Sequence, residues 1–279
     1  MLVIADSGSS KTNWRIISQG KTVLDYTTEG INPYLLDESQ ILQIIDCEDV
    51  HEYSTDIMEL HFYGSGCSRK DKQELVKRVL LEVFPAAEIN VYSDMLGAAR
   101  GICGFNSGIV CVIGTGSNAC EYDGINIVKQ SPSLGYLLGD EGSGVFIGKK
   151  LLKEYLYKKL PPSIQQKFTD KYNLTPEEIL DKIYTQYMPN RYMASFAEFA
   201  IENIDHPYIH GLLYEGFYSF IENNISPFKS EESLKINFVG SVAEAYKTIL
   251  EQVTLDAGYS IGTVKKSPLD GLASFHTFK

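Results

Sequence analysis

A short apolar run that stops abruptly at glycine constrains the fold of this chain more than any other feature. Residues 109–113 read Ile-Val-Cys-Val-Ile, and Gly114, Thr115 and Gly116 follow at once. A short run rich in β-branched residues and bounded by glycine is typical of a buried strand. The two glycines permit a tight turn and leave room for a ligand beside the backbone. Such a turn either binds a phosphate group or joins two strands of a hairpin, and taken alone it favours the hairpin.

The same beginning occurs twice, which predicts an internal structural repeat. Three short strands come first in each half, at 2–5, 13–17 and 21–26 and again at 109–113, 119–122 and 125–129. In the first half they are followed by alternating helices and strands at 39–45, 60–63, 70–84, 89–92 and 95–102. In the second half a glycine-rich loop and a helical region come next, with helices predicted at 148–158, 176–187, 192–204 and 207–223. A strand at 235–239, a helix at 242–255, a strand at 260–264 and a helix at 269–275 complete the chain. The alternation predicts an α/β protein.

Charge and cysteine content narrow the classes of partner and compartment. The chain has 36 acidic and 25 basic residues, a net charge of -11, which argues against nucleic acid or an anionic membrane as the main partner. It has no apolar run long enough to span a bilayer, and its N-terminus leads directly into a predicted strand, so we expect a cytoplasmic protein. Its five cysteines include no C-x-x-C pair, which favours reduced thiols over a disulfide framework or a zinc site.

Glycine-rich or acidic segments follow six of the predicted strands and loops. They are residues 6–8 (Asp-Ser-Gly), 64–66 (Gly-Ser-Gly), 93–94 (Ser-Asp), 114–116 (Gly-Thr-Gly), 138–142 (Leu-Gly-Asp-Glu-Gly) and 240–241 (Gly-Ser). Ligands of α/β sheets bind outside the carboxyl ends of the strands. Coincidence explains one or two such segments, but six together predict a ligand-binding site.

Three of these segments resemble the nucleotide-binding motifs of the actin-like ATPase superfamily. Asp6-x-Gly8-x-Ser10-Lys11 is similar to its first phosphate motif, 114–117 to its second, and Val239-Gly240-Ser241 to its adenosine motif. The turn 114–118, paired with the run LGYLLGDEGS at 134–143, closely resembles N-acetylglucosamine kinase and its relatives, grouped with the BadF/BadG/BcrA/BcrD ATPases. The resemblance covers nearly the whole chain and is weakest over 160–227.

The resemblance implies two actin-like (ribonuclease H-like) domains around a central cleft, each a three-layer α/β/α structure, with a duplicated βββαβαβα core. The domains would be residues 1–107 and 108–279, the second with a helical insertion, and the protein would be a homodimer. It also implies an ATP-dependent kinase that phosphorylates the 6-hydroxyl of an amino sugar, N-acetylglucosamine or glucosamine.

The resemblance assigns roles to individual residues. Asp6 would belong to a Mg²⁺ site, because Mg²⁺ is a hard cation that retains its coordinated waters. Asp94 would be the general base that accepts the proton of the sugar hydroxyl. A turn residue at 6 and a helix N-cap at 94 are the local alternatives. The residues implied for ATP are Gly8, Ser9, Ser10, Lys11, Gly114, Thr115, Gly116, Gly240 and Ser241. Those implied for the sugar are Asn32, Ser65, Gly66, Asp94, Ser117, Asn118, Gly135 and Asp140.

Two other functions remain open at this point. One is a BadF-type activator ATPase with an iron–sulfur cluster at a dimer interface, for which Cys67 and Cys103 are available. The other is a sensor of sugar or nucleotide without turnover. The first phosphate loop carries serine at 9 and 10, where members of the family usually have more glycine. The four residues Asp6, Lys11, Asp94 and Asp140 favour a catalyst.

Overall fold

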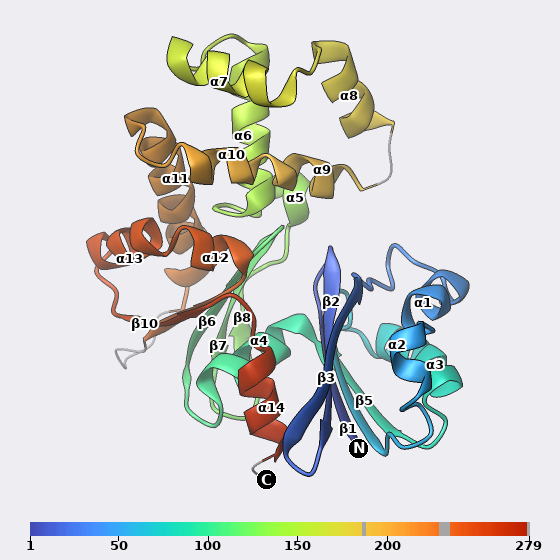
Figure 1. The fold of residues 1–279 in the computed structure, drawn as a ribbon. Helices are drawn as coiled ribbons and strands as arrows, with labels where there is room; N and C mark the ends of the chain where they lie inside the picture. Colours follow the sequence, from blue (N-terminus) through green and yellow to red (C-terminus); the bar gives the residue numbers. More distant parts are fainter. Residues whose placement is uncertain (186–187, 229–234, 278–279) are drawn as a thin grey trace. The chain divides into compact units, whose positions relative to one another are not determined.

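The structure, a computed structural model, describes residues 1–185, 188–228 and 235–277. It contains two five-stranded mixed sheets with flanking helices, and this is the duplicated actin-like α/β fold that the sequence predicts (Figure 1). In the part of the chain that the structure describes, no helix combines the length and the apolar character needed to cross a membrane.

The two sheets have the same strand order. The first runs β3-β2-β1-β4-β5 and the second β8-β7-β6-β9-β10, so each repeat places its first strand in the centre. In the first sheet β1 pairs antiparallel with β2 and parallel with β4, and in the second β6 pairs parallel with β9. The strands are β1 (Leu2–Ser7), β2 (Lys11–Ser18), β3 (Lys21–Glu29), β4 (Glu59–Gly64), β5 (Glu88–Ser93), β6 (Gly108–Ile113), β7 (Ser117–Tyr122), β8 (Ile127–Gln130), β9 (Ile236–Val239) and β10 (Ile261–Lys265).

The first sheet forms the middle layer of a three-layer α/β/α unit. Side chains of β1 alternate between its two faces, as the period of a strand requires. Val3 and Ala5 join a core with α1 and α3, whereas Ile4 joins a second core with Leu269 and Leu272 of α14. The helices of this unit are α1 (Glu38–Ile45), α2 (Glu48–His51), α3 (Lys70–Val83), α4 (Asp94–Cys103) and α14 (Leu269–Thr277).

The compact units do not follow the division predicted at residues 107 and 108. Tyr122–Val128 and Ser267–Lys279 belong to the unit that also contains Met1–Ser107, and the second unit consists of Gly108–Glu121 and Lys129–Lys266. The last helix packs so closely on α4 that a Cβ atom added to Gly271 would lie 1.6 Å from the carbonyl oxygen of Gly101. The C-terminal segment therefore packs with the first unit in the structure. Local sequence patterns do not reveal such contacts between distant segments.

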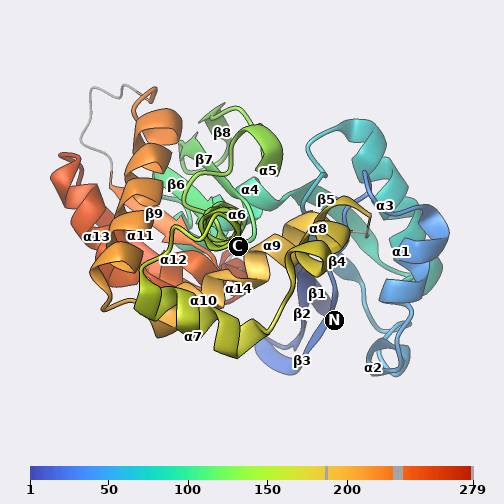
Figure 2. The ribbon, with the colours of Figure 1, turned by 90° about the horizontal axis from the view of Figure 1, so that it is seen from above.

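The second sheet is covered by helices that share one core with β6. Ile109, Cys111 and Ile113 of this strand contribute to that core together with side chains of α6, α11 and α13. Figure 2 shows these helices from above. The helices of this unit are α5 (Gly135–Leu138), α6 (Gly144–Leu156), α7 (Pro162–Tyr172), α8 (Pro176–Tyr184), α9 (Pro189–Ser195), α10 (Ala197–Glu202), α11 (Pro207–Phe220), a π-helix (Ile221–Ile225), α12 (Ser241–Ala245) and α13 (Lys247–Asp256).

The helical insertion departs from the sequence prediction in several places. Helix α7 was not predicted, and the helix predicted at 192–204 is divided between α9 and α10. The one predicted at 242–255 is likewise divided, between α12 and α13. The helix predicted at 176–187 ends at Tyr184, and residues 186–187 lie outside the described residues. Periodicity alone places apolar faces well but does not show where one helix ends and the next begins.

An aromatic core holds the insertion together. Phe196 lies between Tyr172 and Tyr192, with ring centroids 4.7 and 5.1 Å away. The hydroxyl oxygens of both tyrosines are buried and have no hydrogen-bond partner among the described residues. Burial raises the pKa of Tyr172 to about 12, with nearby Glu198 as the second cause. These two buried hydroxyl groups therefore reduce the stability that the packing of their rings provides.

Candidate active site

Asp6 stands near the carboxyl end of β1, just before the turn at residues 8–10. The Ser267 hydroxyl donates to its Oδ2 at 3.5 Å, and the Asn13 side chain also hydrogen-bonds to its carboxylate. Asp6 keeps some exposed surface, yet the protein atoms around its carboxylate raise its pKa to about 7. Burial is the largest cause and the charge of Asp94 the second. The ionised form of Asp6 would thus be stabilised by a cation.

Asp94 is the first residue of α4. The helix is capped by Ser93, whose side chain accepts from the Leu96 N–H, so the local alternative of Asp94 as the N-cap does not hold. Instead its carboxylate accepts from the Ser65 hydroxyl at 2.8 Å and from the Met95 N–H at 2.9 Å. Burial raises the pKa of Asp94 despite these two bonds, which makes it a stronger proton acceptor when it is ionised.

The loops at 30–34 and 64–66 lie against each other. The Asn32 Oδ1 accepts from the Tyr34 N–H at 3.0 Å, which is the turn geometry considered as its local alternative. Gly66 has φ of +78°, and a Cβ atom there would be 2.5 Å from the same Oδ1. Since Ser65 also donates to Asp94, the first unit brings Asn32, Ser65, Gly66 and Asp94 into one cluster.

The turn that follows Asp6 is open to ligands. The Gly8 N–H donates to the Lys11 carbonyl at 3.0 Å and closes the hairpin, while Gly8, Ser10 and Lys11 are exposed. Gly30 packs beneath it, and a Cβ atom at Gly30 would lie 2.4 Å from the Gly8 carbonyl oxygen. A tight turn with exposed glycine and serine residues and an ammonium group can bind a phosphate.

The turn at 114–117 in the second unit is closed by a bond from the Gly114 N–H to the Gly116 carbonyl at 2.9 Å. The N–H groups of Gly144 and Val145, at the start of α6, donate to the carbonyls of Gly114 and Thr115. Gly240 has φ of +134°, and a Cβ atom there would be 2.2 Å from the Ile113 carbonyl oxygen. The backbones at the ends of β6 and β9 therefore approach closely, with the exposed Ser241 beginning α12.

Asp140 is fixed beside this turn. It has φ of +61°, its Oδ1 accepts from the Ser117 N–H at 3.1 Å, and its Oδ2 is 3.0 Å from the Cβ position of Gly116. The Ser117 hydroxyl donates to the Glu141 carbonyl at 2.8 Å. Burial raises the pKa of Asp140, partly offset by the Ser117 N–H. Gly116, Ser117 and Asp140 therefore form the second cluster.

Two residues implied for the sugar do not join the Asp140 cluster. The Asn118 Oδ1 accepts from the Ala119 N–H at 2.8 Å and from the Ser131 hydroxyl at 3.0 Å. Gly135 has φ of +68°, and no described atom lies within 4 Å of its Cβ position. Backbone conformation thus explains glycine at 135 without any close packing.

Three further residues, which are not among those predicted for the site, contact these clusters. Asn13 and Ser267 hydrogen-bond to Asp6, and the backbone of Glu141 holds Ser117. Asn13 lies in a predicted strand, and Ser267 precedes the last helix, far from Asp6 in the chain. No local signal in the sequence marks either contact.

The oxygen-rich surroundings of Asp6 fit Mg²⁺. The described residues contain no group of three or more His, Cys, Asp or Glu side chains that could hold a metal ion. Mg²⁺ does not need one, because it commonly takes one or two carboxylates and fills its other positions with water and substrate phosphates. Asp6 offers such a carboxylate, and because burial raises its pKa, a nearby cation would stabilise its ionised form.

The two cysteines available for a cluster are poorly suited to it. Cys67 is fully buried, and burial, followed by the charge of Asp94, raises its pKa to about 12. Burial likewise raises the pKa of Cys103 to about 11. Iron–sulfur clusters are bound by thiolates, which both environments disfavour.

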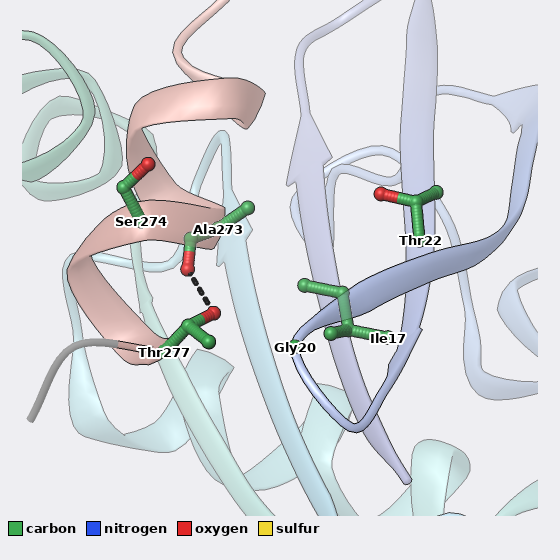
Figure 3. A pocket seen from close by; sticks show the side chains of 6 residues that line it. All are labelled: Ile17, Gly20, Thr22, Ala273, Ser274 and Thr277. Carbon is green, nitrogen blue, oxygen red and sulfur yellow. Dashed lines mark hydrogen bonds between the residues drawn. The ribbon is translucent and has the colours of Figure 1, made fainter.

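A cavity of about 110 Å³ lies elsewhere in the first unit (Figure 3). It is lined by Ile17, Gly20, Thr22, Ala273, Ser274 and Thr277. Ile17 pairs with Leu2, at the opposite end of β1 from Asp6. The cavity has no ionisable side chain in its lining and is separate from the carboxylate cluster.

The chain is similar to solved structures over nearly its whole length. One, a candidate N-acetylglucosamine kinase from Porphyromonas gingivalis, is 36% identical, with a TM-score of 0.95 over 99% of this chain and 98% of that one. A candidate N-acetylglucosamine kinase from Chromobacterium violaceum is 13% identical, with a TM-score of 0.76 over 98% of both chains. A ROK family glucokinase from Streptomyces griseus, in complex with glucose and AMPPNP, is also 13% identical, with a TM-score of 0.58 over 98% and 96%. The last two show the fold alone. Neither a protein-family model nor a curated protein matches the chain.

Proposed function

The chain belongs to the N-acetylglucosamine kinase-like family, grouped with the BadF/BadG/BcrA/BcrD ATPases in the actin-like superfamily, and from this premise we propose that it is an ATP-dependent amino-sugar kinase. The acceptor is N-acetylglucosamine or glucosamine. The oxygen of its 6-hydroxyl forms a bond to the γ-phosphorus, the bond from that phosphorus to the bridging oxygen of ADP breaks, and ADP leaves. The hydroxyl proton goes to Asp94.

The environment of Asp94 is the observation that carries this proposal. A general base has to be ionised, oriented and within reach of the acceptor hydroxyl. Ser65 and the Met95 N–H fix the two oxygens of Asp94, and its raised pKa increases its basicity. Asn32 and Gly66 lie in the same cluster, where their polar groups can bind the sugar.

The nucleotide is assigned to the glycine-containing turns. Phosphoryl transfer is catalysed mainly by positioning and by neutralising charge, which backbone N–H groups and cations supply. Gly8, Ser9, Ser10 and Lys11 bind phosphate in the first unit, and Gly114, Thr115 and Gly116 do so in the second. Gly240 and Ser241 contact the adenosine. Asp6 would hold Mg²⁺, which would supply positive charge to the phosphate oxygens.

The second cluster also contributes to recognition of the sugar. Asp140 accepts hydrogen bonds from sugar hydroxyls, and the Ser117 N–H keeps its carboxylate oriented. Carboxylates that accept from hydroxyls make strong, directional bonds, so they discriminate well between sugars. Asn118 and Gly135 are assigned to the sugar by resemblance to the family.

A coupled assay of ADP release with a panel of hexoses and hexosamines tests the proposal. We expect turnover with N-acetylglucosamine or glucosamine and little ADP release without an acceptor. Absence of turnover with every sugar would contradict it and favour a sensor. An iron-dependent brown colour after anaerobic purification would instead support the activator ATPase.

A further inference from the structure

Ser267 links the last helix to the first carboxylate of the site. The chain passes from the second unit to the first between Lys266 and Ser267. The Ser267 hydroxyl donates to Asp6 Oδ2 at 3.5 Å and accepts from the Leu269 N–H at 3.3 Å. The single hydroxyl therefore belongs both to the start of α14 and to the surroundings of Asp6.

Helix α14 holds this hydroxyl in place because it packs on α4 without intervening side chains. A Cβ atom at Gly271 would be 1.6 Å from the Gly101 carbonyl oxygen, and one at Gly101 would be 2.5 Å from Pro268. Backbone contacts of this kind leave little freedom for sliding. Since α4 begins at Asp94, the same pair of helices fixes the base and the hydroxyl that contacts Asp6.

The other end of α14 is anchored independently. The His276 Nε2 is 2.7 Å from the Tyr63 hydroxyl, and its ring stacks on His61 with centroids 3.6 Å apart. Near the start of the helix, Asp270 pairs with Arg15 of β2 at 2.7 Å. The helix is thus tied to the sheet at both ends, and its N-terminus cannot move away from Asp6 without breaking these contacts.

A carboxylate that binds a cation needs hydrogen-bond donors that fix its orientation, above all when the cation requires a fixed coordination geometry. Mg²⁺ requires near-ideal octahedral coordination, so rotation of a ligating carboxylate weakens binding. We propose that Ser267 is a positioning residue, whose hydroxyl orients the Asp6 carboxylate for the magnesium–nucleotide complex while α14 holds that hydroxyl in register. This inference rests on the proposed kinase function, and nothing in the family motifs points to Ser267.

The test compares Ser267→Ala with Ser267→Thr, and Mn²⁺ serves as a spectroscopic substitute for Mg²⁺. Bound Mn²⁺ is measured by electron paramagnetic resonance in the presence of ADP, and sugar affinity by calorimetry. Loss of a residue that orients a metal ligand costs about 10- to 100-fold in metal affinity. We expect a weakening of about tenfold for Ser267→Ala, recovery in Ser267→Thr, and unchanged sugar affinity in both.

Ser274→Ala is the matched control, because the Ser274 hydroxyl donates to the Asp270 carbonyl of the same helix. It should leave Mn²⁺ affinity unchanged. Equal Mn²⁺ affinity in wild type and Ser267→Ala would overturn the inference, as would equal losses in Ser267→Ala and Ser274→Ala, which indicate a purely structural role. If the wild type and Ser267→Ala both phosphorylate sugar and bind Mn²⁺ with equal affinity, the inference about Ser267 fails but the proposed function stands. A wild-type protein that binds no Mn²⁺ with ADP overturns the proposed function as well.

Discussion

The two units share one strand order but use their carboxylates differently. In the first, burial raises the pKa of both Asp6 and Asp94, and the charge of Asp94 raises the pKa of Asp6 further. In the second, Asp140 accepts directly from the Ser117 N–H, and burial raises its pKa, with the charge of neighbouring Glu141 adding to the rise. The first unit therefore pairs two carboxylates, whereas the charges nearest Asp140 in the second unit are of both signs, Glu141 and Lys149.

This difference suggests a division of work between the units. A raised carboxylate pKa is useful where a cation or a proton arrives during the reaction, as proposed for Asp6 and Asp94. A carboxylate oriented by a backbone N–H is useful where a neutral hydroxyl has to be recognised, as proposed for Asp140. The second unit also carries the helical insertion, whose aromatic core serves stability. The predictions below test this division, from the largest expected effect to the smallest.

Replacement of the base should have the largest effect. Asp94→Asn keeps the shape of the side chain but removes the proton acceptor, so kcat should fall by about 100- to 10,000-fold. Sugar affinity, measured by calorimetry, should change little. Asp71→Asn is the control, since Asp71 also lies in the first turn of a helix but pairs with Arg69 at the surface. Full activity in Asp94→Asn would remove the assignment of the base.

The raised pKa of Asp6 should make the stability of the protein depend on pH. Its pKa is raised from 3.8 to about 7, so the folded protein binds this proton more tightly than the unfolded chain does. The free energy of unfolding should therefore fall as pH rises from about 4 to about 7. Asp6→Asn should remove this fall and stabilise the protein above pH 7 by at most about 4 kcal/mol, since one pKa unit corresponds to about 1.4 kcal/mol.

Denaturant titrations of wild type and Asp6→Asn across this pH range, with a chelator present, provide the measurement. If the free energy of unfolding depends on pH identically in both proteins, the pKa of Asp6 is not raised, and the contrast between the units fails. Asp94, whose pKa is also raised, contributes a slope of the same sign that persists in the variant.

A pair of glycine substitutions probes how the insertion is packed. A Cβ atom at Gly148 of α6 would be 1.8 Å from the Met193 carbonyl oxygen, so Gly148→Ala should destabilise the protein by about 2 kcal/mol. Gly211 of α11 is exposed and has no described neighbour within 4 Å of its Cβ position. Gly211→Ala should stabilise the helix by about 0.5–1 kcal/mol. Thermal unfolding that shifts in the same direction for both would contradict this packing.

The smallest effect is expected from a buried hydroxyl. Tyr192→Phe removes an oxygen that has no hydrogen-bond partner among the described residues, so stability should be unchanged or rise by up to about 1 kcal/mol. In Tyr246→Phe the lost hydroxyl donates to the Ala197 carbonyl, so this control should be less stable. A clear loss of stability in Tyr192→Phe would mean that its hydroxyl has a partner.

The sequence allowed the prediction of features that depend on neighbouring residues. Asp6, Asp94 and Asp140 stand out because each follows a predicted strand or lies in a glycine-rich segment, and the helix predicted at 39–45 is confirmed as α1, which begins with a capping box at Asp37. The hydrogen bond between Ser267 and Asp6, and the contact between Gly101 and Gly271, join segments far apart in the chain. No local pattern encodes them, which is why the sequence does not reveal that the last helix packs with the first unit.

The central claim is that Asp94 of the first unit accepts the proton in the reaction, whereas Asp140 of the second unit recognises hydroxyl groups of the sugar. The most direct test measures kcat and sugar dissociation constants for Asp94→Asn and Asp140→Asn side by side. The account predicts opposite patterns, with kcat lost and affinity kept in Asp94→Asn, and affinity weakened by about tenfold or more in Asp140→Asn with a smaller loss of kcat. The same pattern in both variants would contradict the division of work between the two units.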